Sequence, residues 1–138
     1  MSEIDVKATQ HSTPAPPDPR PRLLLGPPVA VAGVRCSRCS FPSLEDLERC
    51  PVCGADALQT SFGSLGTVFA ATIFRIPVGN HPGPIALAYV DLDDGPRLLA
   101  HGDDTGEALR PGEQVVVTGL GPQGDPVVRR ARDVRSIA

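Results

Sequence analysis

The fold is decided by the stretch Cys36-Ser-Arg-Cys39-Ser-Phe-Pro-Ser-Leu-Glu-Asp-Leu-Glu-Arg-Cys50-Pro-Val-Cys53-Gly54, which contains every cysteine of the chain. It holds two Cys-x-x-Cys pairs that are separated by ten residues. Two such pairs on facing turns place four thiolates at the corners of a tetrahedron, which is the geometry of structural Zn²⁺ sites. Protein ligands then fill every position and leave none for a substrate or a water. The stretch therefore predicts one structural zinc ion per chain, bound by Cys36, Cys39, Cys50 and Cys53.

Two other uses of the cysteines stay open. A rubredoxin-type iron centre has the same spacing, although aromatic residues that could shield it make up only 4% of the chain. A thioredoxin-like dithiol would explain one pair and leave the other unused. The local sequence fits metal-binding turns, because Pro51 fixes φ at the entry of one turn and Gly54 permits a positive φ at its exit. After the first pair this exit position holds Ser40, where a glycine would be easier to accommodate.

Residues 1–28 are predicted to be a proline-rich tail. The stretch Ser12-Thr-Pro-Ala-Pro-Pro-Asp-Pro-Arg-Pro21 cannot form a helix or a central strand, because proline lacks the N–H donor and restricts the residue before it. It is either a simple tether or a docking arm that lies along a partner. Leu23-Leu24-Leu25 is too apolar to be left in water, so we expect this end of the tail to pack on another part of the molecule.

The zinc ribbon is expected at residues 29–61. Short strands are predicted at 29–34, before the first cysteine pair, and at 57–61, after the second. Between the pairs, Ser43 is predicted to cap a single helical turn. A module this small has little hydrophobic core, so metal binding is expected to supply most of its folding free energy, on the order of 10 kcal/mol in isolated fingers.

Residues 62–138 are predicted to form a five-stranded barrel of the OB type. Apolar, β-branched stretches alternate with segments rich in Gly, Pro and Asp, a pattern typical of short strands joined by turns. A long first strand that can bend and serve both sheets favours closure into a barrel, with an open three-layer sandwich as the alternative. The fold class is thus mostly β. The expected strands are 66–76, 85–92, 96–101, 114–120 and 127–132.

Composition and charge exclude some classes of protein. The 138 residues carry a net charge of −3, and the longest apolar run is far shorter than the roughly 20 residues that cross a bilayer. The first residues show no basic and apolar leader, so we expect a reducing, cytoplasmic location in which metal binding is favoured over disulfides. From Phe62 onward there are seven Arg and no Lys against nine Asp and Glu, which disfavours a phosphate-backbone partner.

Outside the cysteines, candidate site residues are few. Arg130 and Arg132 are predicted to contact CoA phosphates or an acidic partner, the alternative being a charged, solvated edge strand. They belong to a basic cluster near the end of the chain. His81 lies in a long Gly/Pro loop that could line a partner's substrate entrance, whereas His11 and His101 are expected to be ordinary surface histidines. The acidic group 91–94 is expected to be a solvated hairpin rather than a cation site. The full basic cluster is Arg129, Arg130, Arg132 and Arg135.

The motifs in their order resemble a known family. Residues 30–135 are similar to the OB-fold acyl-CoA-associated proteins that carry an N-terminal rubredoxin-like zinc ribbon. The chain departs from many of these relatives in having a proline-rich stretch where they have an aromatic-containing helix. The motifs that carry the resemblance are Cys36-x-x-Cys39, Phe41-Pro42, Cys50-Pro-x-Cys53-Gly54, Gly66-Thr-Val, Pro84-Ile-Ala-Leu-Ala-Tyr-Val-Asp-Leu92 with Asp94-Gly95-Pro-Arg, and Leu109-Arg-Pro-Gly112-Glu-Gln-Val-Val-Val117.

The resemblance implies a non-catalytic subunit. Such proteins bind thiolase-fold enzyme subunits in hetero-oligomers, among them acyltransferases, benzoylsuccinyl-CoA thiolase and steroid side-chain aldolases, and help to shape the acyl-CoA site. No local motif in this chain pairs a nucleophile with a base once the cysteines bind metal, so no catalytic residue is expected. A nucleic-acid-binding barrel with a zinc ribbon is the main alternative function, and an electron-transfer iron protein is the third.

Overall fold

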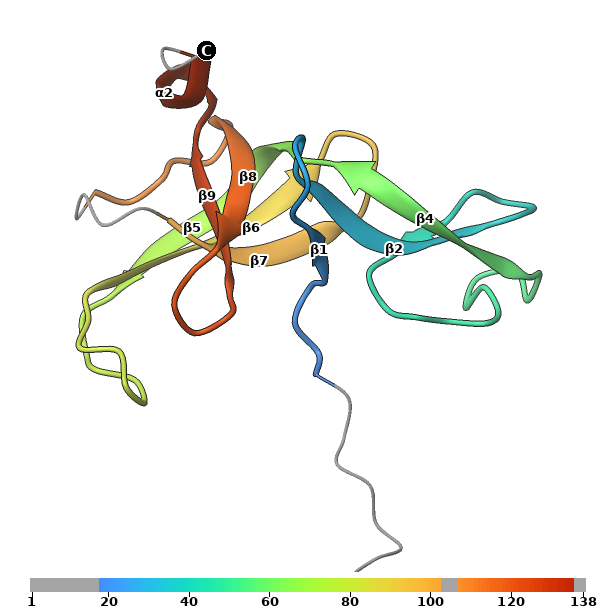
Figure 1. The fold of residues 1–138 in the computed structure, drawn as a ribbon, viewed down its shortest axis with the longest axis horizontal. Helices are drawn as coiled ribbons and strands as arrows, with labels where there is room; N and C mark the ends of the chain where they lie inside the picture. Colours follow the sequence, from blue (N-terminus) through green and yellow to red (C-terminus); the bar gives the residue numbers. More distant parts are fainter. Residues whose placement is uncertain (1–17, 103–106, 136–138) are drawn as a thin grey trace, which may run out of the picture.

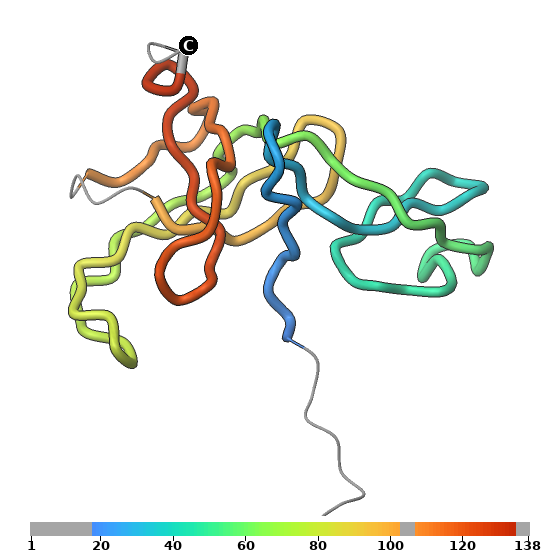
Figure 2. The backbone as a smooth tube through the Cα atoms, in the orientation of Figure 1, coloured from blue at the N-terminus to red at the C-terminus, as the bar shows by residue number. Residues whose placement is uncertain are grey.

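The computed structural model describes residues 18–102 and 107–135 (Figure 1). The first 17 residues of the predicted tail, including His11, lie outside the described residues. The path of the chain runs from a small ribbon sheet into a closed barrel, and the two lie side by side (Figure 2). No helix among the described residues is long and apolar enough to span a membrane.

The ribbon is a four-stranded antiparallel sheet built around one central strand. Strand β2 (Ala30–Cys36) pairs along one edge with β4 (Ala57–Gly63). Along its other edge, β2 pairs first with β1 (Leu23–Leu24) and then with β3 (Pro42–Ser43). Strand β2 ends at Cys36 and therefore delivers the first cysteine of the predicted site.

The barrel closes in the strand order β5-β6-β7-β9-β8, and its last pairing joins β8 back to β5. All neighbours are antiparallel except β7 and β9, which are parallel. This closed five-stranded arrangement confirms the predicted mostly β, OB-type fold. The bounds are β5 (Leu65–Phe74), β6 (Ile85–Leu92), β7 (Arg97–His101), β8 (Gln114–Leu120) and β9 (Pro126–Arg130).

Strand β5 is the long strand that serves both sides of the barrel. Its first residues pair with β8, while the strand from Gly66 to Phe74 pairs with β6 except at the register shift. The register with β6 shifts between Val68 and Ala70, and a bulge of this kind bends a strand and increases its twist. Phe69 lies at the shift and faces solvent. The bend lets one strand turn from one neighbour toward the other, as the sequence predicted.

The structure differs from the sequence predictions in three local features. Ser43 lies in strand β3 instead of capping a helical turn; its Oγ accepts the N–H of Glu45, so the hydroxyl satisfies a local turn. The last strand ends at Arg130, and residues 131–132 belong to helix α2 (Ala131–Arg135). Strand β1 lies within the stretch predicted as tail, where pairing with β2 satisfies the backbone of Leu23 and Leu24.

The ribbon and the barrel share one hydrophobic core. Val31 of β2 and Phe62 of β4 are 0% and 2% exposed, and both belong to the cluster of side chains that fills the barrel. Phe62 fits closely between backbones, because a Cβ on Gly33 or on Gly95 would lie 2.7–2.8 Å from its ring. Leu23 packs against the same cluster, whereas Leu24 and Leu25 are 50% and 55% exposed, so only the first of the three leucines expected to pack does so. The ribbon is therefore anchored to the barrel by side-chain packing as well as by the chain.

Candidate metal centre and barrel pocket

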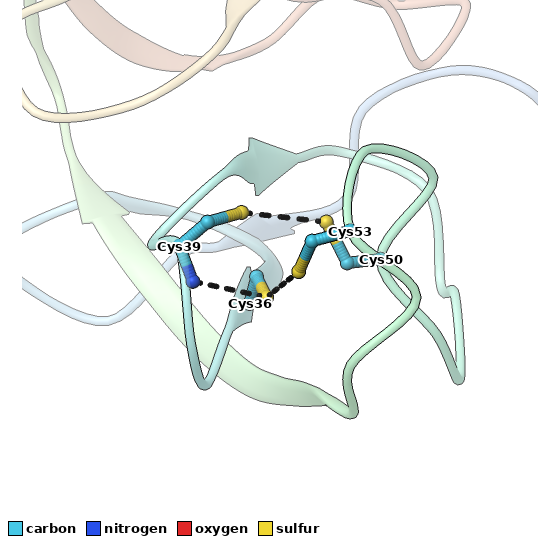
Figure 3. A group of neighbouring side chains, drawn as sticks. All are labelled: Cys36, Cys39, Cys50 and Cys53. Atoms are coloured by element: carbon cyan, nitrogen blue, oxygen red, sulfur yellow. Dashed lines mark hydrogen bonds between the residues drawn. The ribbon is translucent and has the colours of Figure 1, made fainter.

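The four cysteines converge at the far end of the ribbon (Figure 3). Their sulfur atoms all lie within 4.8 Å of one another. Cys36 Sγ is 3.4 Å from Cys53 Sγ, and Cys39 Sγ is 3.6 Å from Cys50 Sγ. Tetrahedral zinc with Zn–S bonds of about 2.3 Å requires sulfur separations of roughly 3.8 Å. The cluster therefore has the size and the donor set of a four-thiolate zinc site.

The two cysteine pairs are held by matching backbone turns. Ser40 N–H donates to the carbonyl oxygen of Cys36, and Gly54 N–H donates to that of Cys50. In return, the N–H groups of the two leading cysteines donate to the carbonyls of Phe41 and Ala55. The leading cysteines are buried and the trailing ones, Cys39 and Cys53, are exposed. Each pair is thus a preformed loop that presents two sulfurs to the same point.

Backbone N–H groups also point at the sulfur atoms. Cys36 Sγ accepts the N–H groups of Cys39 and Arg38, at 3.4 Å and 3.3 Å, and Cys50 Sγ accepts that of Val52 at 3.3 Å. The bond from Cys39 N–H, together with that from Arg38, lowers the pKa of the Cys36 thiol to about 6. Donors aimed at sulfur favour the thiolate, which is the form that binds metal. This donor set fits zinc.

The residue after each pair adopts a left-handed backbone. Gly54 has φ 79° and Ser40 has φ 66°. This conformation costs an ordinary residue roughly 1 kcal/mol, whereas glycine adopts it freely. The serine that the sequence places in a glycine-favouring position is therefore locally strained.

Replacing this serine should relieve the strain. The substitution Ser40→Gly is expected to raise the free energy of unfolding by about 0.5–1 kcal/mol, since the strain exceeds the added freedom of the unfolded chain. Chemical denaturation of the metal-loaded protein measures the change. The matched control is Ser37→Gly, in an exposed position without positive φ, which is expected to be neutral or destabilising. A destabilised Ser40→Gly variant would contradict this account of the turn.

Arg130 has an inward-facing side chain. Its Nε donates to Glu113 Oε2 at 2.8 Å, and its Nη2 donates to the carbonyl oxygen of Ala108 at 3.3 Å. The Arg130 side chain is 9% exposed and that of Glu113 is 24% exposed. The geometry is that of an ion pair between the end of β9 and the segment before β8, with the guanidinium already engaged by protein groups.

Arg132 is placed differently. It lies in helix α2 with its side chain 76% exposed and its Nε 3.8 Å from Asp133 Oδ1. The structure therefore does not bring the two predicted phosphate ligands, Arg130 and Arg132, onto one exposed patch. Contact with CoA phosphates stays a prediction, and Arg132 is the more exposed of the two arginines predicted to make it.

The acidic group at residues 91–94 is engaged by arginines. Asp91 Oδ1 accepts Arg97 Nε at 2.6 Å, and this hydrogen bond holds the pKa of Asp91 below its usual value. Asp94 Oδ1 lies 3.6 Å from Arg35 Nη2. The Arg97 guanidinium also stacks 3.5 Å above the ring of Phe69, so the exposed aromatic on the bulge is partly covered by a cation. These pairings agree with the expected hairpin and give no carboxylate cluster for a cation.

A pocket of about 620 Å³ lies at the end of the barrel remote from the cysteines. The two histidine rings at its rim, His81 and His101, have centroids 6.1 Å apart. His101 Nε2 is 3.6 Å from Asp125 Oδ2. Sequence reasoning treated these residues separately and missed the pocket, although the Gly/Pro-rich loops 77–84 and 121–125 occupy one end of an OB barrel. The lining residues are Ile73, His81, Pro82, Gly83, Pro84, Ala86, His101, Gly102, Gly121, Pro122, Gln123, Asp125 and Val127.

The barrel topology agrees with the comparisons to known proteins. The family model of the ChsH2 C-terminal OB-fold domain matches residues 62–119, a range that contains strands β5 to β8. The barrel is similar to the ChsH2 C-terminal OB-fold domain. This match agrees with the family resemblance that the sequence motifs indicated. The comparison with curated proteins gave no match.

A solved structure extends the likeness beyond the ChsH2-type barrel. The chain is similar to one described as "Ltp2-ChsH2(DUF35) aldolase", with 25% sequence identity and a TM-score of 0.61. The match covers 74% of this chain and 85% of that chain. Because residues 62–138 alone are too few to supply this share, the alignment also includes part of the chain before the barrel.

Proposed function

We propose that this chain is a non-catalytic, zinc-binding subunit of a hetero-oligomeric acyl-CoA enzyme whose catalytic subunit has the thiolase fold. The observation that carries the proposal is the similarity to a chain of the Ltp2–ChsH2(DUF35) aldolase, which extends beyond the barrel and covers most of both chains. In this proposal the barrel docks beside the active-site entrance of the catalytic subunit and helps to shape or stabilise its acyl-CoA site.

The chemistry of the described residues supports a role without catalysis. Cys36, Cys39, Cys50 and Cys53 would hold the zinc ion, which fixes the ribbon and offers no open coordination position. The pocket at the barrel end has two imidazoles and a carboxylate, but the lining residues that the structure describes include no serine, threonine, cysteine or lysine that these groups could activate. The acyl-thioester chemistry is therefore assigned to the catalytic subunit.

Arg132 is the residue that we propose for contact with the CoA phosphates. Its side chain is exposed on helix α2, and a guanidinium binds phosphate oxygens in a bidentate manner. Arg130 would have to leave Glu113 and Ala108 to contact a phosphate. Its contribution in the proposal is therefore to hold the end of β9, from which helix α2 with Arg132 continues.

Co-purification tests the proposal. A tagged full chain, expressed in the cells that naturally produce it, is expected to recover a thiolase-fold enzyme subunit in fixed stoichiometry, identified by mass spectrometry. The isolated chain is expected to turn over no acyl-CoA, and addition of the recovered subunit is expected to restore thiolase, acyltransferase or aldolase activity. Turnover by the isolated chain would overturn the proposal. So would tight single-stranded DNA binding at physiological salt, which favours the nucleic-acid alternative.

A further inference from the structure

The connection between β5 and β6 projects from the barrel as an ordered hairpin (Figure 1). At its tip, Val78 N–H donates to the carbonyl of His81 at 3.0 Å and His81 N–H donates to that of Val78 at 2.9 Å. Gly79, with φ 56°, forms part of the two-residue turn between them. Gly83 N–H donates to His81 Nδ1 at 3.2 Å and fixes the return of the chain. The projection therefore has a defined shape before it meets a partner.

This hairpin exposes apolar side chains. Phe74, Ile76 and Val78 are 43%, 63% and 50% exposed. No residue between Arg75 and Asp91 is charged in the sequence. An ordered projection that holds large apolar groups in water, over an uncharged stretch of this length, has the character of the core of a protein interface.

The barrel-end pocket lies at the base of the same hairpin, whose residues 81–84 form one of its walls. Among the described residues that line it, the one carboxylate already faces two basic groups, since Asp125 lies 3.8 Å from Arg20 Nη1 and 3.6 Å from His101 Nε2. Arg20 in turn binds Asp18 and the carbonyl of Gln123. With these charges paired and the remaining walls mostly proline, glycine and aliphatic, the pocket suits an uncharged group.

His81 gives the pocket rim a hydrogen-bond donor. Because its Nδ1 accepts the Gly83 N–H, the proton of the neutral imidazole lies on Nε2. An Nε2–H at the rim can donate to a carbonyl oxygen, which every residue of a protein segment carries. An uncharged segment can thus fill the pocket with an apolar side chain while one of its backbone carbonyls accepts the hydrogen bond from His81 Nε2–H.

A protein explains these features together, whereas a small ligand explains only part of them. Phe74, Ile76 and Val78 do not line the pocket, so a small molecule inside it leaves all three in water. We propose that the hairpin and the pocket at its base dock together on one partner, and we name this surface the hairpin face, defined by Phe74, Ile76, Val78, His81 and His101. Its occupant is an uncharged apolar segment on the surface of the catalytic subunit. This inference rests on the proposed function, because that function supplies the partner.

Photo-crosslinking in the full chain tests the hairpin face. Benzoylphenylalanine is introduced in place of Val78, and in a matched control in place of Leu65, which is 52% exposed at the opposite end of β5. Irradiation of the natural host cells is expected to join position 78, and not position 65, to the same enzyme subunit that co-purifies with the tagged chain. Mass spectrometry of the adduct identifies the protein and the crosslinked segment, which is expected to be uncharged.

A second measurement follows the affinity. The double substitution Ile76→Ser and Val78→Ser removes only exposed side chains, so the zinc content is expected to stay unchanged while binding of the identified subunit falls at least tenfold. Leu65→Ser is expected to leave binding unchanged. If the subunit co-purifies but gives no adduct at position 78, or if the double variant binds normally, the hairpin face is wrong while the proposed function stands.

Two further outcomes separate the remaining explanations. If no acyl-CoA enzyme co-purifies, the proposed function fails and the inference fails with it. If native mass spectrometry of the isolated chain shows a bound small molecule and position 78 gives no adduct, the pocket binds a small ligand and the inference is overturned.

Discussion

Replacement of Cys50 by serine is expected to abolish zinc binding and to unfold the ribbon. The wild-type chain should contain about one zinc ion, because the four sulfur atoms form a complete tetrahedral donor set. Cys50 is 5% exposed, and its Sγ lies 3.6 Å from that of Cys39, so its loss leaves a buried gap in the tetrahedral donor set. Structural zinc contributes on the order of 10 kcal/mol in isolated fingers, more than a ribbon of this size can lose.

The loss is expected to reach the barrel. Val31 and Phe62 come from ribbon strands but pack in the barrel core, and removing a buried aromatic from a core costs about 3–5 kcal/mol. The Cys50→Ser protein should therefore melt at a lower temperature throughout, and not only in the ribbon. Elemental analysis and thermal denaturation measure both effects.

The control for this variant lies in the same turn. Val52 is 66% exposed and contributes only its backbone N–H to Cys50 Sγ, so Val52→Ser should retain zinc and stability. A Cys50→Ser protein that keeps its fold and one metal ion would contradict the assignment. A red, iron-containing wild-type protein would instead support the rubredoxin-type alternative.

The parts of this fold that the sequence predicted well are those determined by residues close together in the chain. Strands β6 and β8 have the bounds that were expected, because β-branched and aliphatic stretches end abruptly at Gly, Pro and Asp. The cysteine spacing likewise predicted a cluster whose members are three to seventeen residues apart in the sequence. Both signals need only neighbouring residues.

The parts that the sequence predicted poorly depend on distant residues. Strand β1 forms because β2 offers an unpaired edge, which the proline-rich stretch around Leu23 does not reveal. The barrel-end pocket requires loops at 77–84 and 121–125 to meet through the parallel pairing of β7 with β9. No local pattern specifies that pairing.

The burial of Arg130 follows from the alternation of side chains along β9. In β9, Val128 and Arg130 are two residues apart, so their side chains point to the same face of the strand, and Val128 is fully buried. Residues two apart in a strand share a face regardless of their charge. The partner could not be foreseen, because Glu113 approaches Arg130 only through the register that pairs Val115 with Arg130.

Replacement of Arg130 by methionine is expected to destabilise the barrel by about 3 kcal/mol, because removing one member of a largely buried ion pair strands the other. Glu113 would lose its guanidinium partner while its other oxygen still accepts Arg110 N–H at 2.7 Å. For a chain of this size the melting temperature should fall by roughly 10 °C. The exposed neighbour gives the control, since Arg132→Met should change stability by less than about 0.5 kcal/mol.

Two further measurements distinguish a lost ion pair from lost packing. In the double variant Arg130→Met with Glu113→Gln, no charge is stranded, so part of the stability should return.

The pH dependence of the stability is the second measurement. Burial alone would raise the pKa of Glu113, but the Arg110 N–H and the Arg130 guanidinium outweigh it and hold that pKa below its usual value. A lowered folded-state pKa contributes stability above the unfolded value of about 4.3, and this contribution is lost as the pH falls through the folded value. Wild type and Arg130→Met should therefore differ most near neutral pH and converge in acid; a difference independent of pH would assign the role of Arg130 to packing alone.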